Sequence, residues 1–87
     1  MEVMVGKVTH FYNKISVAVV ELCDELKLGD KIAIRGKTTN FEQVVESMQI
    51  EHKPIEVAKP GDKIGLKVKE RVREGDVVYK IVEEEAT

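Results

Sequence analysis

Three glycine-aspartate pairs, each just ahead of an alternating apolar segment, constrain the fold of this 87-residue chain more than any other feature. They are Gly29 and Asp30, Gly61 and Asp62, and Gly75 and Asp76. Glycine adopts positive φ without a Cβ penalty, and an aspartate side chain accepts a hydrogen bond from a nearby backbone amide. Each pair therefore predicts a chain reversal before a β-strand. The alternative, a metal or phosphate site, would need further ligands at fixed spacing.

The segments between these turns have the periodicity of strands. Apolar and polar residues alternate in "KIAIRG", "KIGLKVK" and "VVYKIV". The earlier segment "ISVAVVEL" is apolar on both faces, with Ile15, Val17 and Val19 on one face and Ala18, Val20 and Leu22 on the other. We expect a central strand here, with both of its faces partly covered.

The segment "NFEQVVESMQIEH" is ambiguous. Its apolar residues from Phe41 to Met48 stand at i, i+3, i+4 and i+7, and Asn40 is placed as an N-cap, a pattern typical of a short amphipathic helix. A strand that ends before Pro54 is the alternative. Periodicity alone slightly favours the helix.

Composition and charge are those of one small domain with a mainly aliphatic core. Hydrophobic residues make up 43% of the chain, but only two Tyr, two Phe and no Trp are present. The net charge of -2 argues against a protein that coats nucleic acid by bulk electrostatics. The single cysteine, Cys23, cannot form an intramolecular disulfide, and no apolar stretch is long enough to span a bilayer. We therefore expect a cytoplasmic protein with no membrane partner.

Three stretches, "LKLGDKIAIRG", "SMQIEHKPIEVAKPGDKIGLKVK" and "VREGDVVYK", together resemble the second domain of elongation factor Tu and its relatives among the translation GTPases. This resemblance implies an all-β fold, a small closed antiparallel β-barrel of about six strands over residues 1–82. It also makes the ambiguous segment a strand. The terminal "EEEAT", residues 83–87, reads as an acidic disordered tail.

Sequence motifs that would indicate catalysis or nucleotide binding are incomplete in this chain. The stretch "RGKTTN" ends a predicted strand, but the first glycine of a phosphate-binding loop would fall at Lys31. Cys23 has no histidine near it in the sequence, and His10 and His52 lie far apart. We expect no enzymatic activity, no bound nucleotide, no metal and no cofactor.

The resemblance implies a binding surface for RNA, because the second domain of elongation factor Tu helps to hold the aminoacyl end of tRNA and several relatives touch ribosomal RNA. The corresponding loop offers cations, hydroxyl and amide donors and one ring for stacking: Arg35, Lys37, Thr38, Thr39, Asn40 and Phe41. A second basic group includes Lys67, Lys69 and Arg71. Lysines that protect an exposed edge strand from aggregation are the alternative interpretation of this group.

Three functions remain open at this point. The first is a stand-alone, non-catalytic, translation-factor-like module that contacts tRNA, rRNA or a protein of the translation or tRNA-modification machinery. The second is a protein-interaction accessory subunit, akin to the C-terminal barrel of collagenase-like peptidase family proteins. The third is a small-ligand barrel, which the scarcity of aromatic residues disfavours.

Overall fold

The computed structural model describes residues 1–82, so the predicted acidic tail at 83–87 lies outside the described residues. The prediction of an all-β, antiparallel fold is confirmed. The strands are β1 (Glu2–Tyr12), β2 (Val17–Leu22), β3 (Leu26–Lys27), β4 (Lys31–Arg35), β5 (Asn40–Val44), β6 (Met48–Ile50), β7 (Lys53–Ile55), β8 (Val57–Ala58), β9 (Lys63–Lys67) and β10 (Val77–Ile81).

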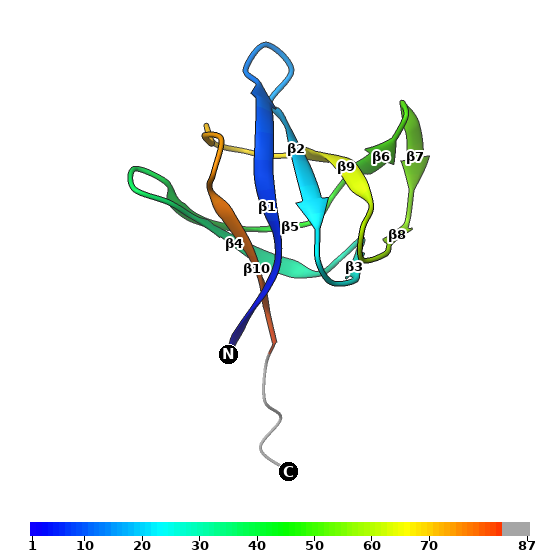
Figure 1. Ribbon diagram of the computed structural model, residues 1–87, viewed down its shortest axis with the longest axis horizontal. Helices are drawn as coiled ribbons and strands as arrows, with labels where there is room; N and C mark the ends of the chain where they lie inside the picture. The colour runs from blue at the N-terminus through cyan, green and yellow to red at the C-terminus, as the bar shows by residue number, and fades with distance from the viewer. Residues whose placement is uncertain (83–87) are drawn as a thin grey trace.

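The prediction of a closed barrel is wrong. Eight strands form one sheet in the order β5-β4-β10-β1-β2-β9-β6-β7, and β3 and β8 form a separate two-stranded sheet (Figure 1). The large sheet curves strongly, but its end strands β5 and β7 do not pair with each other. Strand β7 is only three residues long and contains Pro54, which has no N–H to donate, so it is a poor template for a further strand.

The ambiguous segment folds as two short strands, so the helix that periodicity favoured is wrong. Strands β5 and β6 flank an irregular stretch at residues 45–47. This stretch changes the direction of the chain, and Phe41, Val45 and Met48 all enter the core despite their helix-like spacing. A bend between two strands can thus produce the sequence period of a helix.

The three glycine-aspartate pairs form three equivalent turns, which confirms the architectural prediction. Gly29, Gly61 and Gly75 have φ of 89°, 91° and 93°. In each turn the aspartate amide donates to the carbonyl three residues earlier, on Lys27, Lys59 or Arg73, at 3.1–3.2 Å. The aspartate carboxylate accepts the amide of that same residue at 2.8–3.0 Å. A glycine with positive φ at the third position is the signature of a type II turn.

Each turn is also joined to a buried aliphatic residue of another segment. The glycine amide donates to the carbonyl of that residue, and the residue's own amide donates to the aspartate carbonyl, at 2.8–2.9 Å. The three partners are Val45, Leu22 and Val8. The turns therefore hold distant segments around the core rather than only reversing the chain.

Replacement of Gly61 by alanine tests this role of the turns. A Cβ at this position would meet no atom within 4 Å, so the substitution changes backbone strain and not packing. We expect Gly61→Ala to lower the free energy of unfolding by about 1–2 kcal/mol, because an L-residue is disfavoured at positive φ. Urea denaturation would measure the loss. Lys59→Ala, which shortens an exposed side chain of the same turn and keeps the backbone amide, is the control and should change stability by less than about 0.5 kcal/mol. An unchanged midpoint for Gly61→Ala would contradict the turn assignment.

The core lies inside the curve of the large sheet. It is almost entirely aliphatic, with Val, Ile and Leu side chains from β1, β2, β4, β9 and β10 fully enclosed. The side chain of Gln43, on the end strand β5, bridges to the end of β9 and the segment that follows it. Its amide nitrogen donates to the Lys67 carbonyl at 2.8 Å, and its side-chain oxygen accepts a hydrogen bond from the Lys69 amide at 2.9 Å. One side chain thus connects two strands that share no backbone ladder.

Candidate interaction surface

The predicted RNA loop is the turn between β4 and β5, and only part of it is available to a partner. Lys37 and Thr38 are exposed. Thr39 is buried, and Phe41 is 8% exposed and belongs to the core. The ring of Phe41 is therefore not presented for stacking on a base.

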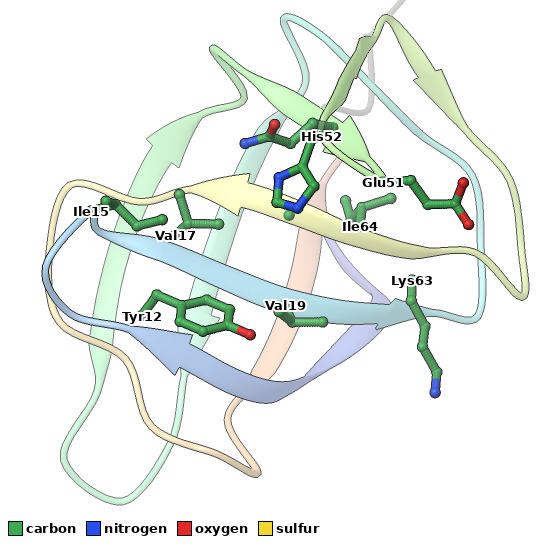
Figure 2. Close-up of a pocket in the computed structure, with 10 residues that line it drawn as sticks. Tyr12, Ile15, Val17, Val19, Glu51, His52, Lys63 and Ile64 are labelled. Atoms are coloured by element: carbon green, nitrogen blue, oxygen red, sulfur yellow. The ribbon is translucent and has the colours of Figure 1, made fainter.

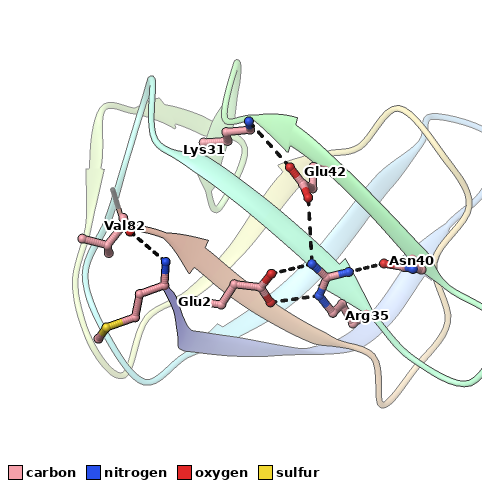
Figure 3. A network of polar contacts seen from close by, with 7 residues as sticks. Glu2, Lys31, Arg35, Asn40, Glu42 and Val82 are labelled. Atoms are coloured by element: carbon pink, nitrogen blue, oxygen red, sulfur yellow. Dashed lines mark hydrogen bonds and ion pairs between the residues drawn. The ribbon is translucent and has the colours of Figure 1, made fainter. Parts of the chain in front are cut away.

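Arg35 lies in a network of side chains from β1, β4 and β5 (Figure 3). Its guanidinium donates to both carboxylate oxygens of Glu2, at 2.9 Å and 2.5 Å, and to the side-chain oxygen of Asn40. Glu42 lies 3.9 Å from the same guanidinium. The hydrogen bond to Glu2 raises the pKa of Arg35, and the same bond lowers the pKa of the Glu2 carboxyl. Two predicted RNA contacts, Arg35 and Asn40, are thus engaged within the chain.

The lowered pKa of Glu2 has a defined consequence for stability. A carboxyl whose pKa falls on folding stabilises the protein above its unfolded pKa of about 4, and this contribution disappears as pH falls through the folded value. We expect Glu2→Gln to lower the thermal midpoint slightly at pH 7 and not at all near pH 2. Because the pair is exposed, 0.5 M NaCl should reduce the difference at pH 7. A difference that persists at pH 2 would contradict this origin.

The second predicted group lies elsewhere on the chain. Lys67 donates from its ammonium to the Ile15 carbonyl at 2.8 Å, while Lys69 and Arg71 are exposed beyond β9. Strand β9 pairs with β2 on one side and β6 on the other. The interpretation of these lysines as protection for an edge strand is therefore wrong, because β9 is an interior strand.

One concave surface of the large sheet was not predicted from the sequence. It is an open depression of about 250 Å³ on the outer face of the large sheet (Figure 2). One wall is apolar and the other polar, with the backbone of β9 between them. The residues that line it are Tyr12, Ile15, Val17, Val19, Gln49, Glu51, His52, Lys63, Ile64 and Gly65. We call it the outer pocket.

The register of the sheet explains the outer pocket. Val19 of β2 lies opposite Gly65 of β9, which in turn lies opposite Gln49 of β6. Ala18 and Val20 point into the core, so Val17 and Val19 face outward. The pocket therefore crosses three neighbouring strands on the face opposite to the core.

A sequence signal for this surface existed, although its meaning was missed. The segment "ISVAVVEL" is apolar on both faces, and both faces were expected to be partly covered. The structure buries the inner face and covers the outer face only in part. Ile15 remains 56% exposed and Tyr12 51%, and Val17 and Val19 are half-buried.

Within residues 1–82, no three His, Cys, Asp or Glu side chains gather in a way that could hold a metal ion. That same part of the chain contains no helix with the length and apolar character needed to cross a membrane.

The fold and the surface define a small antiparallel β domain with an apolar depression on its outer face. No family model matches the sequence. The chain is 52% identical over 94% of its length to an uncharacterised protease of Methanocaldococcus jannaschii, and 37% identical over 91% of its length to a collagenase of Porphyromonas gingivalis. It spans about a fifth of each relative, 20% in both cases.

The fold is also that of a solved domain from a peptidase. The C-terminal domain of a Geobacillus thermoleovorans protein described as a U32 peptidase superposes with a TM-score of 0.84, at 23% identity, over 90% of this chain and 91% of that one. A selenomethionine variant of that domain superposes with a TM-score of 0.82 over 86% of this chain and 95% of that one, also at 23% identity.

These comparisons correct three expectations. The resemblance to the second domain of elongation factor Tu is wrong as a family assignment, because the relatives are proteases and collagenases and the matching solved domain is the C-terminal domain of a U32 peptidase. The description of the chain as an RNA-binding translation module depended on that family assignment and is therefore also wrong. The expectation of no enzymatic activity is also corrected, because the curated relatives, of which this chain spans a fifth, are named as a protease and a collagenase.

Proposed function

We propose that this chain is an accessory domain of a U32-type, collagenase-like peptidase and that it acts by binding polypeptide. Its partner in this role is the larger part of such a protein, which we call the peptidase body, whether joined to this chain or separate from it. The reaction served is hydrolysis of peptide bonds, carried out with the peptidase body.

The observation that carries the proposal is the identity to the M. jannaschii protease. At 52% over 94% of this chain, the match accounts for nearly every described strand but for only 20% of the protease. The other four-fifths of that protein must pack beside, or be tethered to, a domain of this kind. The exposed side chains of Tyr12 and Ile15, beside the half-buried Val17 and Val19 of β2, support contact over simple tethering. Apolar surface gathered at one place is typical of interaction sites.

A replacement experiment in the M. jannaschii protease tests this role. Three proteins are compared on casein and on gelatin: the intact protease, the protease without the segment that matches this chain, and a chimaera in which this chain replaces that segment. We expect deletion to lower kcat/KM at least tenfold, because a domain that binds polypeptide contributes to the rate by positioning it correctly. The chimaera should recover kcat/KM to within about threefold of the intact protein.

A lower activity of the deletion variant could come from loss of folding or from loss of the proposed function. Size-exclusion chromatography and circular dichroism of the deletion variant separate loss of folding from loss of function. A chimaera no more active than the deletion variant would contradict the proposed function, and so would a deletion variant as active as the intact protease.

A further inference from the structure

We infer that the outer pocket receives one large apolar side chain from the peptidase body. This inference rests on the proposed function and names the place of contact. Three separate observations support it: the glycine at the floor of the pocket, the conformation of the turn that forms its polar wall, and the character of the apolar wall.

Gly65 is the first observation. Of the six glycines, three have positive φ and two would bring a Cβ within 2.7 Å of another atom. Gly65 has neither constraint: its Cβ would lie 3.3 Å from Val17 Cγ1 and 3.3 Å from Gln49 Cγ, both in side chains that can shift slightly. Glycine inside a strand weakens it, and it often marks a place where another group approaches closely. Here the absent side chain is what leaves the pocket open.

The turn between β6 and β7 is the second observation. Ile50 pairs with Lys53, so Glu51 and His52 form a two-residue turn, and their φ are 51° and 65°. Such turns strongly favour Asn-Gly, because both central residues need positive φ. Glu51 and His52 therefore lower the stability of the isolated domain relative to Asn and Gly at these two positions. Figure 2 shows the imidazole of His52 over β9, beside the pocket, where a partner would touch it.

The apolar wall is the third observation and identifies the occupant. Tyr12 and Ile15 are each more than half exposed and flank the half-buried Val17 and Val19. A volume of about 250 Å³ lies below the usual range for small-molecule sites and suits a single anchoring side chain. Strand β1 begins and β10 ends at the side of the sheet opposite the β1–β2 turn, so a connection there leaves the pocket free (Figure 1).

Hydroxyl-radical footprinting of the chimaera, compared with the isolated 87-residue chain, tests the inference. Tyr12 and His52 are oxidisable and lie on opposite walls, so each can report on substitutions of the other wall. In the chimaera we expect both to be oxidised at least fivefold more slowly than in the isolated chain. Tyr12→Ser with Ile15→Ser should return His52 to the isolated rate. Glu51→Asn with His52→Gly should return Tyr12 to the isolated rate.

The second pair of substitutions also distinguishes binding from folding. In the isolated chain, Glu51→Asn with His52→Gly should raise Tm by a few degrees, because the turn then has the residues it favours. Met4→Ser with Val57→Ser removes two similarly exposed apolar side chains outside the pocket, and it should leave the protection of Tyr12 and His52 intact.

Two results would overturn the inference. The first is an active chimaera in which Tyr12 and His52 are oxidised as fast as in the isolated chain. The second is protection that survives both pocket variants. Either result leaves the proposed function standing, whereas an inactive chimaera counts against the proposed function itself.

Discussion

Leu66→Ala is expected to lower the free energy of unfolding by about 2–5 kcal/mol, the largest effect of any single substitution considered for this chain. Leu66 is fully buried on β9, with Ala18 of β2 opposite on one side and Met48 of β6 on the other. Backbone ladders on both sides of β9 limit how far the structure can collapse into the space left by the side chain. The cost should therefore include most of the cavity term as well as the lost transfer free energy.

Urea denaturation followed by circular dichroism measures the effect of Leu66→Ala. For a domain of this size, a loss of this magnitude is a large share of the total stability, so the midpoint should shift strongly. Leu28→Ala removes the same atoms from a side chain that is 40% exposed, and it should change stability by less than about 1 kcal/mol. Equal losses for the two variants would mean that Leu66 is not in the core.

Asp76→Ala is expected to cost about 1.5–3 kcal/mol, more than the same substitution in the equivalent turn at Asp62. Both carboxylates accept the amide of the residue three positions earlier, at 2.8 Å and 2.9 Å. Asp76 is only 5% exposed, however, and Asp62 is half-buried. Water can replace the lost acceptor more easily at Asp62, so the penalty for an unsatisfied amide should be smaller there.

Gly36 provides an independent check on the environment of Asp76. A Cβ at Gly36 would lie 1.9 Å from Asp76 Oδ1, so Gly36→Ala should displace the carboxylate and destabilise the domain even though the turn sequence is intact. Thermal unfolding of Asp76→Ala, Asp62→Ala and Gly36→Ala gives the comparison. A smaller loss for Asp76→Ala than for Asp62→Ala would show that burial does not control the strength of these turns.

Local chemistry in the sequence was enough to predict the turns and the strand-rich fold. A glycine with positive φ and an aspartate that accepts an amide act within four residues, so the pattern is visible without tertiary information. Closure of a barrel depends instead on whether two distant strands meet. Strands β5 and β7 do not pair with each other. The alternation of Val and Ile within each strand gives no information about which distant strands pair.

The candidate site was harder to predict, because side-chain type says little about where a residue faces. Phe41 was selected for its ring and proved to be a core residue, and Arg35 was selected for its charge and proved to pair with Glu2. The outer pocket depends on the register that places Val19, Gly65 and Gln49 side by side. The apolar outer face of β2 was its only visible trace in the sequence.

Hydrogen-exchange mass spectrometry of the chimaera beside the isolated chain tests whether this chain docks on a peptidase body. We expect slower exchange in the chimaera for peptides that contain the β1–β2 turn and the β6–β7 turn. The β4–β5 turn contributes no residue to the outer pocket, and its exchange should not change. Exchange that is identical in the two proteins throughout residues 1–82 would contradict docking.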